Sequence, residues 1–186
     1  MNWVKKRIDL LLGSVIVLLQ LNAAAQSYVG RNIKTAIFSS TPVEDIRAVS
    51  RSGTAAIVGR TREIVVQVPI KSLGFDRKLM QEHFNENYME SDKYPQAKFK
   101  GTIDQQIDFS KDGSHNVSVT GLLSVHGVDK MRTIPGKLSI KDGIIQIFTE
   151  FKVACADHKI KIPTLIVTKV AEVISIKVDG KLNPVK

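Results

Sequence analysis

Apolar and polar residues alternate with a period of two along most of the chain after residue 26, and this period constrains the fold more than any other feature. Between residues 115 and 126, Val117, Val119, Leu123 and Val125 alternate with serine, threonine and histidine. The segments 62–71 and 144–153 show the same period. Successive side chains of a β-strand point to opposite faces, so this pattern is typical of antiparallel strands with one buried face. The chain is therefore predicted to be all-β.

Turn signals separate these alternating segments into about eight predicted strands. The strands are expected near residues 34–40, 46–57, 62–71, 97–108, 115–126, 133–140, 144–153 and 171–180. Asp112-Gly113 and Asp142-Gly143 lie between alternating runs and are predicted to form tight hairpin turns, because both residue types tolerate a positive φ. A closed antiparallel β-barrel is favoured, since closure removes exposed strand edges; a two-sheet sandwich is the alternative. A barrel of about eight strands is either filled by side chains or holds one small ligand.

One short helix is predicted to interrupt the strands between Gly74 and Tyr94. Asp76 is expected to cap its start, because an aspartate oxygen accepts hydrogen bonds from the free amides of a first turn. A helical projection gathers the apolar side chains in one half, so Leu79, Met80 and Phe84 are expected to plug the barrel. The projection places Gln81, Glu82, Asn85 and Glu86 in the other half, facing water.

The first 25 residues are predicted to be a signal peptide. Three basic residues near the start precede an apolar run from Leu10 to Leu21, and Ala23-Ala24-Ala25 offers the small side chains that a signal peptidase requires. The apolar run is short for a transmembrane helix, although a retained anchor is the alternative. We expect cleavage after Ala25, export to the periplasm, and one domain formed by residues 26–186.

The net charge of +9 gives only a weak indication of partners. Basic residues are scattered singly among acidic ones, without an arginine-rich helix or an aromatic-interleaved basic stripe, so a nucleic-acid partner is not expected. A mild positive excess is compatible with peripheral contact with an anionic membrane surface, or with a charge that only maintains solubility.

No sequence motif predicts catalysis, a metal site or a cofactor. The chain has no G-x-S-x-G, G-x-G-x-x-G, Walker or H-E-x-x-H motif. His83 and Glu86 lie three residues apart, but the helical projection separates them, so a metal site is not expected. The cluster of Cys155, Asp157 and His158 does not converge on an extended strand and is interpreted as a strand end that turns into a loop. His126 is predicted to lie at the barrel rim.

Two longer motifs resemble the YceI-like family, especially short members from Bacteroidota. The first is S-D-K-Y-P-Q-A-K-F at residues 91–99, and the second is G-L-L-S-V-H-G-V-D-K at residues 121–130. The resemblance extends over roughly residues 27–179. It implies a lipocalin-like antiparallel barrel with an apolar tunnel that binds polyisoprenoid or related amphiphilic chains, usually in the periplasm. No catalytic residue is generally recognised in that family, so none is implied here. One departure, Arg60-Thr61-Arg62, falls in a predicted surface turn.

The leading hypothesis is an exported, non-enzymatic binding protein for an isoprenoid or lipid-like ligand. Eleven residues are predicted to bind the ligand. The apolar side chains expected to line the cavity are Phe99, Val119, Leu123, Val125, Ile145, Ile147 and Phe151, and Phe84 is expected to point inward from the helix. A polar end of the ligand is expected at the rim, near His83, Tyr88 or His126. Two alternatives remain open: a solid barrel that acts in envelope stress or protein interactions, and an enzyme that uses His83 with Glu86, or His126, on an amphiphile. The hypotheses differ in whether the barrel is hollow and in which side chains meet inside it.

Overall fold

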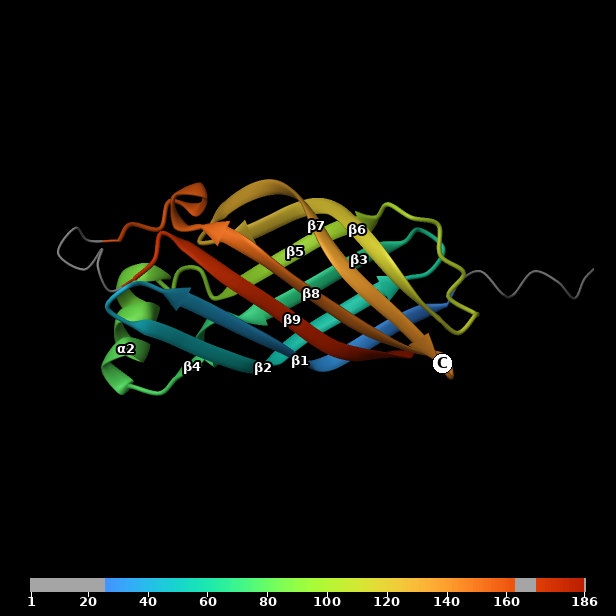
Figure 1. Ribbon diagram of the computed structural model, residues 1–186, viewed down its shortest axis with the longest axis horizontal. Coiled ribbons are helices and arrows are strands. Elements are labelled where there is room, and N and C mark those ends of the chain that lie inside the picture. The colour runs from blue at the N-terminus through green and yellow to red at the C-terminus, as the bar shows by residue number, and fades with distance from the viewer. Residues whose placement is uncertain (1–25, 163–169, 186) are drawn as a thin grey trace, which may run out of the picture.

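Eight antiparallel strands close into a barrel in the computed structural model, which describes residues 26–162 and 170–185 (Figure 1). The barrel strands are β1 (Ser27–Ser40), β2 (Asp45–Val58), β3 (Glu63–Pro69), β5 (Gln96–Ile103), β6 (Gly113–Val125), β7 (Val128–Lys141), β8 (Ile144–Ala154) and β9 (Val173–Pro184), and β4 (Gly74–Phe75) is a short additional strand. Apart from β4, neighbours in sequence are neighbours in the barrel, and β1 closes it by pairing with both β2 and β9. The short strand β4 extends the sheet beside β2. The predicted all-β barrel is confirmed.

The strand bounds differ from the prediction where the period of two is interrupted. β1 begins at Ser27 and not near residue 34, because Asn32 has a φ of 59° and the pairing with β2 shifts register after Arg31. β3 ends at Pro69, and β5 ends at Ile103 and not near 108, where a loop follows. A bulge interrupts alternation without ending a strand, which is why the first half of β1 was not predicted.

The turns confirm one of the two predicted hairpins. Asp142 and Gly143 have φ values of 52° and 73° and join β7 to β8 tightly. The prediction for Asp112-Gly113 is wrong, because a loop of residues 104–112 joins β5 to β6 and Gly113 is already the first residue of β6. The β6–β7 hairpin turns instead at His126 and Gly127, with φ values of 51° and 70°.

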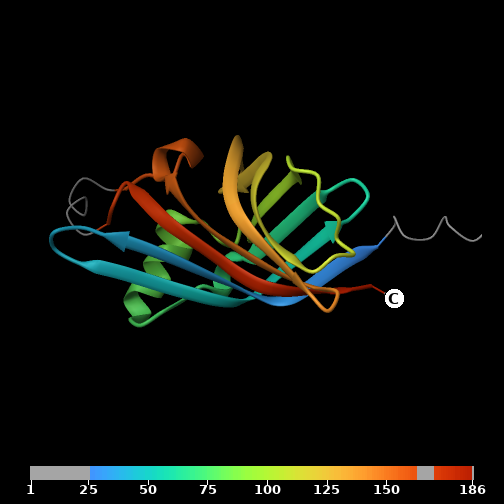
Figure 2. The ribbon, with the colours of Figure 1, turned by 45° about the vertical axis from the view of Figure 1, so that its right-hand side comes forward.

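The predicted helix is present, but its register differs from a regular α-helix. α2 (Lys78–His83) continues into η3 (Phe84–Tyr88), a π-helical turn in which the Met89 amide donates to the Phe84 carbonyl at 2.9 Å. The predicted cap by Asp76 is wrong, since the helix begins after Arg77 and no side chain caps it. Leu79 also does not plug the barrel, because 63% of it is exposed. Figure 2 shows α2 at the end of the barrel where β1 turns into β2, which we call the helix end.

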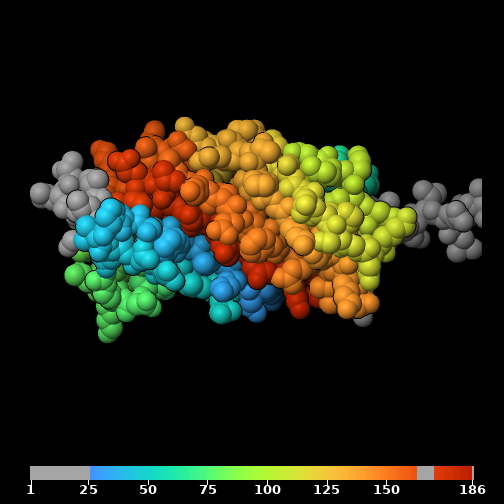
Figure 3. All heavy atoms as spheres, viewed as in Figure 1, coloured from blue at the N-terminus to red at the C-terminus, as the bar shows by residue number. Residues whose placement is uncertain are grey.

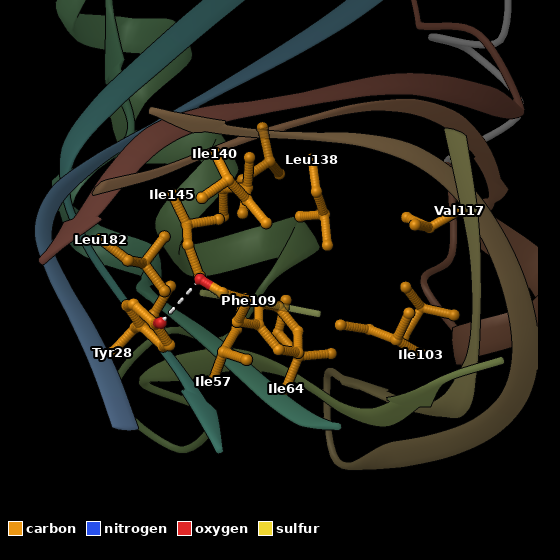
Figure 4. Packing of buried hydrophobic residues seen from close by; sticks show 14 of the residues in the cluster. Tyr28, Ile57, Ile64, Ile103, Phe109, Val117, Leu138, Ile140, Ile145 and Leu182 are labelled. Atoms are coloured by element: carbon orange, nitrogen blue, oxygen red, sulfur yellow. Dashed lines mark hydrogen bonds between the residues drawn. The ribbon is translucent and has the colours of Figure 1, made fainter. Parts of the chain in front are cut away.

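The opposite end of the barrel, which we call the termini end, is packed with side chains. Figure 4 shows this cluster, in which the Tyr28 hydroxyl donates to the Phe109 carbonyl at 3.2 Å. Ile57, Ile103 and Ile145 are fully buried in the same cluster. A second, smaller cluster lies at the helix end and includes Ile70, Met89, Leu123, Val125 and Val153. Within the described ranges, no helix has the length and apolar character needed to cross a membrane.

Candidate functional site

An apolar cavity of about 240 Å³ occupies the barrel between the packed termini end and the helix end. Its surface is formed almost entirely by carbon atoms, although the lining residues include Lys98 and Lys137. Eight of the predicted ligand-binding residues line it: Phe84, Tyr88, Phe99, Val119, Leu123, Val125, Ile147 and Phe151. The hollow part of the barrel therefore coincides with most of the predicted site.

The walls also include strands that the sequence did not single out. Side chains of β1, β3 and β9 contribute Ile37, Ile64, Val66, Val68, Ile174, Ile176 and Val178. Their signal was present as alternation, but apolar residues on both faces of β3 and β9 concealed which face points inward. Closure of the barrel decides this, because each inward residue must be opposite an inward residue of the neighbouring strand. Thr35↔Val178 and Ile37↔Ile176 are such pairs.

The floor of the cavity is the packed cluster of the termini end, and Ile145 belongs to it. Ile145 is 0% exposed and points inward as predicted, yet it does not reach the cavity because Tyr28, Phe109 and Leu182 fill the barrel at its level. Burial, and to a lesser extent the charge of Asp108, raises the pKa of Tyr28 above its ordinary value of 10.0. Tyr28 thus remains a neutral hydrogen-bond donor in the floor.

The roof of the cavity is formed by α2 and η3. Met80, Phe84 and Tyr88 line the cavity from this side, and the buried Met89 follows them. The rings of Phe75 and Phe84 lie 4.8 Å apart, which fastens the helical segment to β4. Burial, followed by the neighbouring Cys155, raises the pKa of Tyr88 above 10.0. The expected role of this segment as a plug is supported for Met80 and Phe84.

His83 and His126 lie outside the cavity wall, and His126 lies at the rim of the barrel, as predicted. His126 lies in the β6–β7 turn, where its Nδ1 is 3.1 Å from the His158 carbonyl and its Nε2 is 2.8 Å from a carboxylate oxygen of Glu90. The Tyr94 ring packs edge-on against it, with centroids 4.7 Å apart. Both nitrogens of His126 are thus occupied by partners from two other segments, and this residue ties the rim together. His83 lies in the last turn of α2 and is half-buried away from the wall.

Cys155, Asp157 and His158 diverge, as interpreted from the sequence. They lie in η4 (Cys155–His158), a short 3-10 helix after β8. Cys155 lines the cavity, and burial, ahead of the charge of Glu172, raises the pKa of its thiol above 9.0. Asp157 forms an ion pair with Arg132 at 2.7 Å. His158 is fully buried, and its Nδ1 donates to the Val128 carbonyl at 3.1 Å.

A single polar atom in the wall has no partner. Thr35 lines the cavity and is 5% exposed, and its hydroxyl makes no hydrogen bond among the described residues. Its cross-strand neighbour Ser50 is bonded to Ser72 at 2.6 Å, and Ser72 donates to the Pro69 carbonyl at 2.6 Å.

The described residues contain no cluster of three or more histidine, cysteine, aspartate or glutamate side chains able to hold a metal ion. The site can therefore enclose an apolar chain, and the described residues of its wall include no histidine, aspartate or glutamate.

Comparison with known proteins gives the same fold. Residues 23–182 match a family model described as the YceI-like domain. A polyisoprenoid-binding domain from Saccharophagus degradans, implicated in plant cell wall breakdown, is 13% identical with a TM-score of 0.73, covering 86% of this chain and 98% of that one. BcnA from Burkholderia cenocepacia is 14% identical with a TM-score of 0.67, covering 80% and 95%. The YCEI protein of Campylobacter jejuni is 17% identical with a TM-score of 0.55, covering 90% and 88%.

No match was found among curated proteins. The structural likenesses are distant in sequence and show the fold alone, whereas the family model matches most of the chain. The resemblance indicated by the motifs at residues 91–99 and 121–130 is thereby confirmed. Together with the closed barrel and its apolar cavity, the match shows that this chain belongs to the YceI-like domain family.

Proposed function

We propose that this protein is a non-enzymatic binding protein that holds a long apolar or amphiphilic chain, such as a polyisoprenoid, an isoprenoid quinone or a lipid, inside the barrel. The observation that carries the proposal is the carbon-lined cavity between a packed floor and a helical roof. The similar domain from Saccharophagus degradans, described as polyisoprenoid-binding, supports the same ligand class. The family match supports a binding function more generally.

The composition of the wall determines which part of a ligand is enclosed. Each buried methylene group contributes about 0.8 kcal/mol to binding when it leaves water. A charged group inside this wall would lose its hydration without gaining a partner, which costs several kcal/mol. The enclosed part is therefore hydrocarbon, and a polar end remains near the rim; Thr35 offers one hydroxyl to an uncharged oxygen along the chain.

The positions of the histidines support a non-enzymatic function. Acid–base catalysis requires a titratable group within hydrogen-bond reach of the reacting atoms. His126 is bonded to Glu90 and to the His158 carbonyl, and neither His126 nor His83 belongs to the cavity wall. The solid-barrel alternative is disfavoured by the cavity itself.

Export to the periplasm is part of the proposal and rests on the sequence pattern of residues 1–25, which lie outside the described residues. A soluble carrier in that compartment would take up and release chains by peripheral contact with a membrane. Amino-terminal sequencing of the protein purified from its native host tests this: a mature chain beginning at Gln26 is expected, and a retained residue 1 would contradict it.

The ligand proposal is tested by displacement of N-phenyl-1-naphthylamine, which fluoresces in apolar surroundings. The protein should bind this probe, and geranylgeraniol should displace it. Ala97→Trp places a bulky ring in the cavity from β5 and should abolish binding; Thr102→Trp, on the exposed face of the same strand, is the matched control. Lipid mass spectrometry of protein from the native host would then identify the natural occupant.

Absence of probe binding, or equal binding by Ala97→Trp and Thr102→Trp, would refute the proposal. Circular dichroism must show the same strand content for both variants, so that loss of binding is not loss of fold. An empty protein from the native host that also rejects the probe would favour the solid-barrel interaction protein.

A further inference from the structure

The barrel is not paired along its whole circumference. β7 and β8 pair only from Lys137↔Phe148 to Lys141↔Ile144, next to their tight turn. Residues 128–136 of β7 have no pairing with β8, although they remain paired with β6. Figure 1 shows β7 arching away from β8 toward the helix end. We call the unpaired region between residues 128–136 and 149–154 the β7–β8 gap.

Pro135 explains why the pairing stops. The Thr149 hydroxyl of β8 donates to the Pro135 carbonyl at 2.6 Å, so this carbonyl points toward β8. The nitrogen and carbonyl of one strand residue point to the same neighbouring strand, and a proline nitrogen carries no hydrogen to donate. The ladder therefore loses its donor at Pro135, and one side-chain hydrogen bond replaces it.

The cavity reaches both edges of this gap. Pro135 and Gly136 line it from β7, and Phe148, Thr149 and Phe151 line it from β8. On the outside, the space-filling view shows a continuous surface over these strands without a visible opening (Figure 3). Passage through the gap thus requires β7 and β8 to separate, and only side-chain contacts resist that separation between residues 128 and 136.

Those contacts come from η4 at the helix end of the gap. His158 donates to the Val128 carbonyl at 3.1 Å, and Asp157 pairs with Arg132 at 2.7 Å. Such contacts are more easily broken than a strand ladder, because each costs about 1 kcal/mol while a ladder must break cooperatively. The β7–β8 gap is therefore a weak seam in the described barrel wall. β2 and β3 also pair over a short stretch, from Thr54↔Gln67 to Val58↔Glu63, but β4 pairs with the next part of β2 and covers that edge.

Along this gap, the β7 residues on the inward face of the strand change from apolar to basic. Ile134 is opposite Val119, but Arg132 is opposite Gly121 and Lys130 is opposite the cavity residue Leu123. Arg132 is neutralised by Asp157, whereas Lys130 is exposed and has no ion-pair partner among the described residues. A positive charge thus stands beside the gap, in the register that leads into the carbon-lined cavity.

We propose that the β7–β8 gap is the portal through which an apolar chain enters and leaves the cavity, and that an anionic end of the chain stays in the gap beside Lys130. This inference rests on the proposed function and adds the route of exchange and the charge of the polar end. It selects amphiphiles with a phosphate or carboxylate end over uncharged ones of equal tail.

A disulfide across the gap tests the portal. A Cβ built on Gly136 lies 3.6 Å from the Thr149 Cβ, within the range that a disulfide requires. Gly136→Cys with Thr149→Cys is made in a Cys155→Ser background. The control is Ser114→Cys with Ser139→Cys, which joins β6 to β7 near the termini end, where the two hydroxyls are 3.3 Å apart and the residues are paired.

The release rate of N-phenyl-1-naphthylamine is measured by stopped flow on the oxidised and reduced forms. Oxidation of the gap pair should slow release and uptake by about tenfold or more, which reduction reverses, while the control pair should have no effect. Unchanged rates in the oxidised gap pair would overturn the portal while leaving the proposed function intact. Failure of the wild-type protein to bind the probe at all would overturn both.

The anionic end is tested with two competitors that share one tail, geranylgeranyl phosphate and geranylgeraniol. Lys130→Gln should weaken the binding of geranylgeranyl phosphate by about fivefold, which is the effect expected for one exposed charge pair. The affinity for geranylgeraniol should not change. Lys141→Gln, an exposed lysine at the other end of the same strand, should affect neither. Equal effects of the two variants would refute the role of Lys130.

Discussion

At the scale of single residues, His126 holds the rim because both of its nitrogens face acceptors. The His158 carbonyl can only accept, so Nδ1 must donate to it, and the carboxylate of Glu90 faces Nε2. One side chain thereby joins three parts of the chain: the β6–β7 turn, Glu90 after η3, and His158 in η4.

We expect His126→Ala to lower the free energy of unfolding by about 2 kcal/mol, because two hydrogen bonds and the contact with Tyr94 are lost. Urea denaturation measures the change. Glu86→Ala, which removes an exposed carboxylate from η3, should shift the same curve by less than about 0.5 kcal/mol. Equal shifts would contradict the rim role of His126.

Cys155 gives the protein a dependence on alkaline pH. The pKa of its thiol is raised above 9.0 in the folded protein by burial and then by Glu172, so the unfolded chain loses this proton first as the pH rises. The contribution is fully present below pH 9.0 and disappears as the pH passes through the higher folded value. The wild-type protein should therefore lose stability relative to Cys155→Ala above pH 9.0.

Thermal unfolding of both proteins between pH 7 and pH 10 measures this difference, and parallel curves would contradict it. Because Cys155 lines the cavity, its reaction with a small alkylating reagent should also be slow and become slower when geranylgeraniol is bound. An alkylation rate that does not respond to the alcohol would indicate that Cys155 does not contact the occupant.

At the scale of elements, β5 and β6 approach closely because glycines are opposite each other in their ladder. Gly101 pairs with Gly121, and a Cβ on Gly121 would overlap the Lys100 carbonyl and the Gly101 Cα. The Phe99 ring lies over Gly101, where a Cβ would be 3.0 Å from it, so the missing side chain leaves room for an aromatic residue of the cavity wall. Glycine pairs of this kind permit local bending of a barrel.

Gly121→Ala should therefore lower the free energy of unfolding by about 3 kcal/mol or more, since backbone atoms must move apart. Gly143→Ala is the comparison: its φ is 73°, but no atom lies within 4 Å of the added Cβ. Backbone strain alone should cost about 1 kcal/mol there. Chemical denaturation compares the two, and a larger loss for Gly143→Ala would show that the β5–β6 contact can relax.

At the scale of the whole molecule, one barrel contains both a packed core and a binding cavity. Ile145 and Ile147 are neighbours on the inward face of β8, yet Ile145 belongs to the floor and Ile147 to the wall. The stability of the barrel is thus concentrated at the termini end, while the helix end can accommodate a ligand.

Ile145→Ala should cost about 4 kcal/mol, because it leaves a cavity in a filled region, with little change in probe affinity. Ile147→Ala should lower the free energy of unfolding by less, because its side chain already borders the cavity. It should also weaken the binding of N-phenyl-1-naphthylamine. Geranylgeraniol at 100 times its dissociation constant should stabilise the wild-type protein by about 2.7 kcal/mol. Denaturation with and without the alcohol measures all three, and equal losses for both variants would contradict the division of the barrel.

The sequence by itself determined the class of fold, the approximate strands and the helical interruption, because alternation and turn residues are local signals. It also supplied eight residues of the cavity wall; Val119, Leu123 and Val125, for example, share one face of one strand. The π-helical turn after His83, the bulge near Asn32 and the hairpin at His126 were missed, because each departs from the regular period on which the prediction depended.

Only the tertiary structure decided which strand faces point inward, that Ile145 is floor and not wall, and that β7 separates from β8. These features depend on pairings between residues far apart in sequence, and closure around eight strands determines them together. The sequence shows Pro135, but only the pairing of β7 with its neighbours decides that the Pro135 nitrogen points toward β8. Alternation therefore specifies a barrel, whereas barrel closure specifies where it is hollow.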